Sequence, residues 1–127
     1  MKKGKILLVD DNIDLCAMMG EMLRRENFDA QICHNGQQAI DILAKDQGFD
    51  LVISDLLMPQ LDGIALITHM RQSNLRIPVI IVTGGGVTLR FDDAMKAVEN
   101  LADAVLKKPV PLAILLEKIN QLIKIPA

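Results

Sequence analysis

The feature that most constrains the fold is an alternation between short apolar runs and longer segments with helical spacing. Three runs are continuous and apolar, namely 6–9 (ILLV), 51–53 (LVI) and 78–82 (PVIIV). Strands covered by helices on both faces have this composition. Two weaker candidates, at 29–34 and 103–107, suit the edge strands of the same sheet.

The segments between these runs repeat apolar residues at helical spacing. The first helix is expected to begin after Asp11 or Asn12, the second near Gly36, and the third after Asp62 and Gly63. A fourth is expected over 91–100. The predicted inward positions are Ile13, Cys16, Met19, Gly20 and Leu23; Ala39, Ile40 and Leu43; Ile64, Ile67 and Met70; and, in the last helix, Leu112, Leu115, Leu116, Ile119, Leu122 and Ile123. Repeated strand and helix units predict an α/β fold, a parallel sheet with helices on both faces and right-handed crossovers.

In such folds the binding site lies at the carboxyl ends of the strands. The residues that follow the predicted central and late strands are Asp10, Asp11, Asp55, Thr83, and the group Lys107, Lys108 and Pro109. We therefore expect three carboxylates, a hydroxyl and an ammonium group to gather at one edge of the sheet.

The second strand ends differently. Only His34 and Asn35 follow it, which suggests an edge strand away from the site. His34 and His69 have no partner at metal-ligand spacing, so structural roles are favoured for both.

Three neighbouring carboxylates repel one another and titrate as a coupled set unless a cation joins them. Few protein oxygens and an open side favour Mg²⁺, with Mn²⁺ as the alternative. A carboxylate can also attack phosphorus and form an aspartyl phosphate. The metal, Lys108 and the Thr83 hydroxyl would then balance the charge of the phosphoryl oxygens.

Composition excludes several other classes. The chain of 127 residues fits one domain, and its net charge of −2 argues against direct nucleic-acid binding. Its apolar runs are too short for a signal peptide or a membrane span. Cys16 and Cys33 are predicted to be buried thiols of a cytoplasmic protein.

Four segments together resemble the receiver domain of two-component response regulators. They are ILLVDDN (6–12), DLVISDLLMPQLDG (50–63), PVIIVTG (78–84) and ADAVLKKP (102–109). The similarity covers nearly the whole chain, which is close in size to the single-domain chemotaxis regulators. It implies a single receiver domain over 1–127 with a flavodoxin-like, doubly wound (βα)5 fold and strand order 2-1-3-4-5.

The resemblance also implies roles for individual residues. Asp55 is similar to the phosphoacceptor, and Thr83 and Lys108 resemble the residues that contact the phosphoryl group. Asp10, Asp11 and Asp55 would bind Mg²⁺ together with the backbone carbonyl of Leu57. The Lys108–Pro109 peptide bond is expected to be cis, and Lys107 is expected to face solvent or the output surface.

The function implied is a phosphoacceptor that takes a phosphoryl group from a histidine kinase or a histidine phosphotransfer protein. It is a signalling domain rather than an enzyme, although it assists its own phosphorylation and dephosphorylation. Output to an unknown downstream protein is expected from the fourth helix, fifth strand and fifth helix, by a monomer or a phosphorylation-dependent dimer. No effector domain is expected within this sequence after the last helix.

The main alternative is a receiver-like module that binds partners without phosphorylation. A phosphatase of the haloacid dehalogenase type would need DxDx[TV] after the first strand, where this chain has DDNID. A flavodoxin would need a Ser/Thr/Gly-rich phosphate loop there and aromatic residues beside the flavin.

Two departures from the family concern the switch. Val105 stands where relatives usually carry an aromatic residue, and Thr83 is followed by three glycines, 84–86. We therefore expect activation to be reported by ordering of residues 84–91. Leu57 and Gly85 carry no polar side chain to orient water, which predicts slow self-dephosphorylation. Pro59 is expected to stiffen its loop, and Gly63 to supply turn freedom.

Overall fold

The computed structural model describes residues 2–46, 48–56, 58, 61–84, 96 and 100–123. In the described part of the chain, strands and helices alternate as predicted up to the fourth strand. The strands are β1 (Gly4–Val9), β2 (Phe28–Cys33), β3 (Leu51–Asp55), β4 (Val79–Thr83) and β5 (Ala104–Lys107). The helices are α1 (Ile13–Arg25), α2 (Gly36–Lys45), α3 (Gly63–Gln72) and α5 (Leu112–Leu122).

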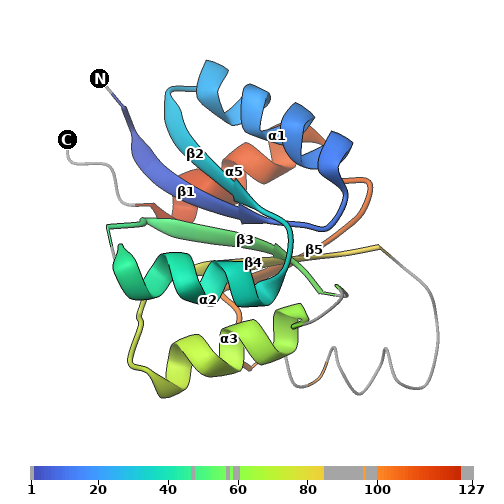
Figure 1. The fold of residues 1–127 in the computed structure, drawn as a ribbon. Coiled ribbons are helices and arrows are strands. Elements are labelled where there is room, and N and C mark those ends of the chain that lie inside the picture. The colour runs from blue at the N-terminus through green and yellow to red at the C-terminus, as the bar shows by residue number, and fades with distance from the viewer. Residues whose placement is uncertain are drawn as a thin grey trace.

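The strands form one parallel sheet in the order β2-β1-β3-β4-β5. Helices α1 and α5 cover one face and α2 and α3 cover the other (Figure 1). The predicted flavodoxin-like α/β fold and strand order are confirmed. The predicted helix over 91–100 falls almost entirely outside the described residues.

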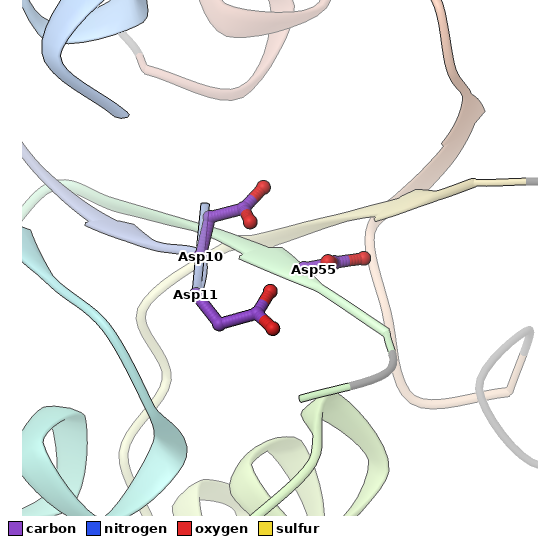
Figure 2. A group of neighbouring side chains, drawn as sticks. All are labelled: Asp10, Asp11 and Asp55. Carbon is purple, nitrogen blue, oxygen red and sulfur yellow. The ribbon is translucent and has the colours of Figure 1, made fainter. Parts of the chain in front are cut away.

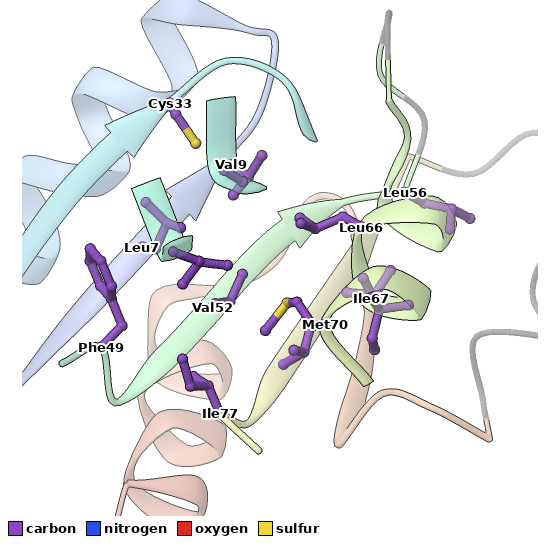
Figure 3. Packing of buried hydrophobic residues seen from close by; sticks show 14 residues of the cluster. Leu7, Val9, Cys33, Phe49, Val52, Leu56, Leu66, Ile67, Met70 and Ile77 are labelled. Atoms are coloured by element: carbon purple, nitrogen blue, oxygen red, sulfur yellow. The ribbon is translucent and has the colours of Figure 1, made fainter. Parts of the chain in front are cut away.

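Alternate strand residues supply two separate cores. Leu7, Val9, Val52 and Ile81 point to the face covered by α2 and α3, where Ala39, Leu66 and Met70 meet them (Figure 3). Ile6, Leu8, Ile53 and Val82 point to the opposite face, against Cys16, Leu23, Leu115 and Ile119. Because both faces of the central strands are buried, these strands carry apolar residues at every position.

The first helix begins at Ile13 and is capped by Asn12, whose side chain accepts a hydrogen bond from the Leu15 backbone N–H. Ile13 itself was predicted to face the core, and this is wrong because it is 66% exposed. Helical spacing gives the angular position of a residue. Helical spacing does not determine whether another part of the chain packs against the first turn of the helix.

Gly63 has a role other than turn freedom. A Cβ atom there would lie 2.4 Å from the backbone oxygen of Asp55, and the Gly63 N–H donates to Leu56 O at 2.8 Å. The glycine is therefore required for the close approach of α3 to the end of β3. Asp62 caps the same helix through the Ala65 N–H.

None of the helices in the described part of the chain combines the length and the apolar character needed to cross a membrane.

Candidate functional site

Strand register brings the predicted site residues to one edge of the sheet. Val9 lies beside Ser54, and Asp55 lies beside Val82. Thr83 lies beside Lys107. Asp10, Asp55, Thr83 and Lys108 therefore all lie at the carboxyl edge of the sheet.

Asp10, Asp11 and Asp55 form an acidic cluster. Each offers a carboxylate oxygen, and these three oxygens lie within 4.8 Å of one another. The three carboxyl groups extend to the same side of the strand ends (Figure 2). Asp10 is buried, Asp55 is half-buried and Asp11 is exposed, so the cluster is open on one side. An open set of hard oxygen donors fits Mg²⁺.

Lys108 joins this cluster from the end of β5. Its Nζ lies 3.0 Å from Asp10 Oδ2 and 3.4 Å from Asp55 Oδ2. The preceding Lys107 is exposed, as predicted, and the Lys108–Pro109 bond is cis. One ammonium group therefore bridges two of the three carboxylates.

Burial and charge oppose each other at these groups. Burial, followed by the Asp10 charge, raises the pKa of Asp55, while Lys108 acts to lower it. Burial alone would lower the pKa of Lys108, but the hydrogen bond that Lys108 donates to Asp10 and the Asp55 charge outweigh burial and raise it. The site therefore stabilises a charged Lys108 but leaves Asp55 short of positive charge.

Thr83 lies at the end of β4 and is 2% exposed. Its Oγ1 has no hydrogen-bond partner among the described residues. Its backbone oxygen accepts a hydrogen bond from the Lys108 N–H at 2.7 Å, which ties the ends of β4 and β5 together. A buried hydroxyl without a partner is costly unless something else satisfies it, so this group fits a ligand oxygen.

The end of β2 also reaches the site, which the sequence reading had placed away from it. His34 Nδ1 lies 3.0 Å from the backbone oxygen of Asp10, and Cys16 Sγ donates to the same oxygen at 3.3 Å. The signal that could have found His34 is the strand order. Because β2 pairs with β1, with Cys33 beside Val9, the residue after β2 must lie next to Asp10.

Cys16 and Cys33 are both buried free thiols, as predicted. Burial, with the Asp10 charge, raises the pKa of Cys16 to about 11, and burial raises that of Cys33 to about 12. Cys16 therefore meets Asp10 as a neutral hydrogen-bond donor.

Three predictions in this region fall on parts of the chain that the structure does not describe. They concern the Leu57 carbonyl, the loop at Pro59, and all of the 84–91 segment except Gly84. Val105 is described and is half-buried in β5, packed against the core of α2 and α3.

Comparison with known proteins identifies the family of the chain. The family described as response regulator receiver domain matches residues 6–120. The transcriptional regulatory protein CpxR of Escherichia coli K12 is 39% identical over 106 residues, which are 84% of this chain and 43% of that protein. The chain thus spans less than half the length of this curated relative.

Solved structures give the same result. A receiver domain protein from Clostridium thermocellum superposes with a TM-score of 0.85 at 27% identity, covering 94% of each chain. The receiver domain of a signal transduction histidine kinase from Syntrophus aciditrophicus gives 0.83 at 31% identity, covering 94% of this chain and 89% of that one. The family match, the 39% identity to CpxR and the shared fold together show that the chain belongs to the response regulator receiver domain family of two-component systems.

Proposed function

We propose that the domain accepts a phosphoryl group on Asp55 from a phosphohistidine of a histidine kinase or a histidine phosphotransfer protein. The observation that carries the proposal is the set of charged and polar groups that gather around Asp55. The acidic pair of Asp10 and Asp11, the Lys108 ammonium and the Thr83 hydroxyl, which has no partner among the described residues, lie around the end of β3. Such surroundings supply the charges and donors that phosphoryl transfer requires.

The three carboxylates of Asp10, Asp11 and Asp55 would hold Mg²⁺, with the Leu57 carbonyl as a further ligand by family resemblance. When bound, Mg²⁺ supplies positive charge to the carboxylates and to the phosphoryl oxygens. Lys108 already lies near Asp55 and would approach a phosphoryl group placed there. The Thr83 hydroxyl would donate its unused hydrogen to a phosphoryl oxygen.

In the transfer step an oxygen of the ionised Asp55 carboxylate attacks phosphorus. An O–P bond forms as the P–N bond of the phosphohistidine breaks, and the electron pair leaves on the imidazole nitrogen. Asp55 must be ionised for this step, so the Lys108 charge that opposes the raised pKa of Asp55 helps to prepare the nucleophile.

The phosphorylated domain would act on a downstream protein in the cytoplasm through the fourth helix, β5 and α5. The added charge at Asp55 would bias two conformations of the domain. This domain is not proposed to turn over an external substrate. CpxR is named as a transcriptional regulatory protein, and a transcriptional output of a longer protein is one form that the downstream step could take.

Incubation with acetyl phosphate and Mg²⁺, followed by intact mass measurement, tests the proposal. We expect one added phosphoryl group on the wild-type chain and none on Asp55→Asn. Asp41→Asn is the matched control, because Asp41 is an exposed aspartate on α2.

Three outcomes would count against the proposal. An adduct retained by Asp55→Asn would place the acceptor elsewhere. No adduct with acetyl phosphate, phosphoramidate or a phosphorylated phosphotransfer protein would favour a phosphorylation-independent interaction module. Turnover of many phosphomonoesters per chain would indicate a phosphatase.

A further inference from the structure

Asp10 is held at each of its backbone and side-chain polar atoms. Its N–H donates to Cys33 O at 3.1 Å, and its Oδ1 accepts from the Asn12 N–H at 3.0 Å. Its Oδ2 pairs with Lys108. Its backbone oxygen accepts from two side chains, Cys16 and His34. A carbonyl oxygen has two lone pairs, so both contacts can form together.

The His34 contact is the shorter of these two, at 3.0 Å against 3.3 Å for Cys16. Nitrogen is also the stronger donor, since a thiol donates only weakly. A carbonyl oxygen can only accept, so Nδ1 of His34 must carry the proton in this contact.

The backbone around His34 is fixed as well. The His34 N–H donates to Gln38 Oε1 at 2.8 Å, and Asn35 caps α2 by accepting from the Gln38 N–H at 2.8 Å. The imidazole ring is thus carried by a short, hydrogen-bonded connection between β2 and α2.

The carbonyl that His34 holds belongs to the peptide between Asp10 and Asp11. Since a peptide unit is planar, a rotation of this plane about the Cα–C bond of Asp10 turns the Asp10 carbonyl and displaces the Asp11 Cα atom together. A rotation of this plane would therefore move the Asp10 and Asp11 carboxylates relative to each other. Asp11 is exposed, so its position depends on this backbone rather than on packing of its side chain.

We propose that His34 is a positioning residue for the acidic pair, and that its Nδ1–H keeps Asp10 and Asp11 arranged for a divalent cation. The proposal rests on the proposed function, because it concerns the same metal site. Under this proposal the end of β2 contributes a positioning residue to the metal site, although neither the charge of His34 nor metal-ligand spacing in the sequence indicates it.

Mg²⁺ titrations followed by calorimetry and by the backbone amide resonances of residues 10 and 11 test this role without a phosphodonor. His34→Leu removes the donor and should weaken Mg²⁺ binding by about tenfold, the lower end of what loss of an outer-shell contact costs. His34→Asn should restore most of the affinity, because the Asn amide nitrogen lies close to the position of Nδ1 and donates in its place. His69→Leu is the matched control, since His69 is exposed on α3.

The result that overturns the proposal is equal Mg²⁺ affinity in His34→Leu and the wild-type chain, or an equal loss in His34→Leu and His34→Asn. If His34→Leu does not fold, ring ¹⁵N shifts of the wild-type chain decide instead. The Nδ1–H tautomer supports the role of His34, and the Nε2–H tautomer alone excludes it. A wild-type chain that binds no Mg²⁺ would contradict the proposed function itself, whereas wild-type affinity in His34→Leu would contradict only the role of His34.

Discussion

Asp10 and Thr83 both lie at the ends of buried parallel strands, on the same edge of the sheet, yet their surroundings differ. The backbone and carboxylate of Asp10 make hydrogen bonds to β2, to α1 and to Lys108. The Thr83 hydroxyl has no partner among the described residues, and the nearest described atom to a Cβ atom placed at Gly84 would be the Lys108 Cδ at 3.9 Å.

This difference suggests that two sides of one site have different functions. The β1 side, defined as the ends of β1 and β2 with the start of α1, holds negative charge in a fixed arrangement. The β4 side, defined as Thr83 and Gly84, keeps one donor and some space free for an incoming group. A fixed acidic side costs no reorganisation when a cation binds, whereas a free hydroxyl gains a bond only when a ligand oxygen arrives.

The largest expected effect comes from Lys108→Met, because Lys108 contacts both Asp10 and Asp55 directly after the end of β5. Loss of its charge should slow phosphoryl uptake from acetyl phosphate by about 10²-fold, as for removal of one preorganised electrostatic contact. Mg²⁺ affinity should rise at the same time, because the carboxylates lose their competing cation. Time courses of phosphoryl uptake measure the rate, and calorimetry measures the Mg²⁺ affinity.

Lys107→Met is the control for this change, since Lys107 is exposed and adjacent in sequence. An equal slowing in both variants would show that general surface charge, and not the bridge to Asp10 and Asp55, is responsible.

Gly63→Ala should have the next largest effect. Its new methyl group would overlap the Asp55 backbone oxygen and should lower the free energy of unfolding by about 1–3 kcal/mol. Gly84→Ala tests the β4 side with the same chemical change and should alter stability by less than about 1 kcal/mol. Urea unfolding followed by circular dichroism measures both, and a Gly84→Ala loss as large as that of Gly63→Ala would show that the β4 side has no free space for an added methyl group.

Asn12→Ala tests the β1 side and is expected to have a smaller effect on stability. The Asn12 side chain caps α1 through the Leu15 N–H at 3.0 Å, so its loss should cost about 1 kcal/mol of stability. The backbone contact from the Asn12 N–H to Asp10 remains, so phosphoryl uptake should change less than stability. Asn12→Ser keeps a capping oxygen and should recover the stability in the same unfolding measurement. No recovery would mean that the cap is not the source of the loss.

Thr83→Val is expected to have the smallest effect on stability, and of the opposite sign. It replaces a buried hydroxyl that has no described partner with a methyl group of similar size, so stability should be unchanged or rise by up to about 1 kcal/mol. Stabilisation by a beryllium fluoride phosphoryl mimic should nevertheless decrease, whereas Thr83→Ser should retain it. A clear loss of stability in Thr83→Val without the mimic would show that the hydroxyl is already satisfied.

Much of this site could be predicted from the printed sequence alone. Apolar runs that end in Asp10, Asp55 and Thr83 predict buried parallel strands, and parallel strands place their carboxyl ends at one edge. The family resemblance added Lys108 and the strand order. These inferences succeed because they depend on residue type and on the periodicity of a single element.

The tertiary structure decided what depends on two elements meeting. Ile13 has the helical phase of a core residue but lies where no strand covers it, and Gly63 is needed because α3 passes close to Asp55 O. His34 lies beside Asp10 only because β2 pairs with β1 in the register that aligns Cys33 with Val9. Periodicity along one segment carries no information on such distances, because they are set by the packing and register of segments far apart in the chain.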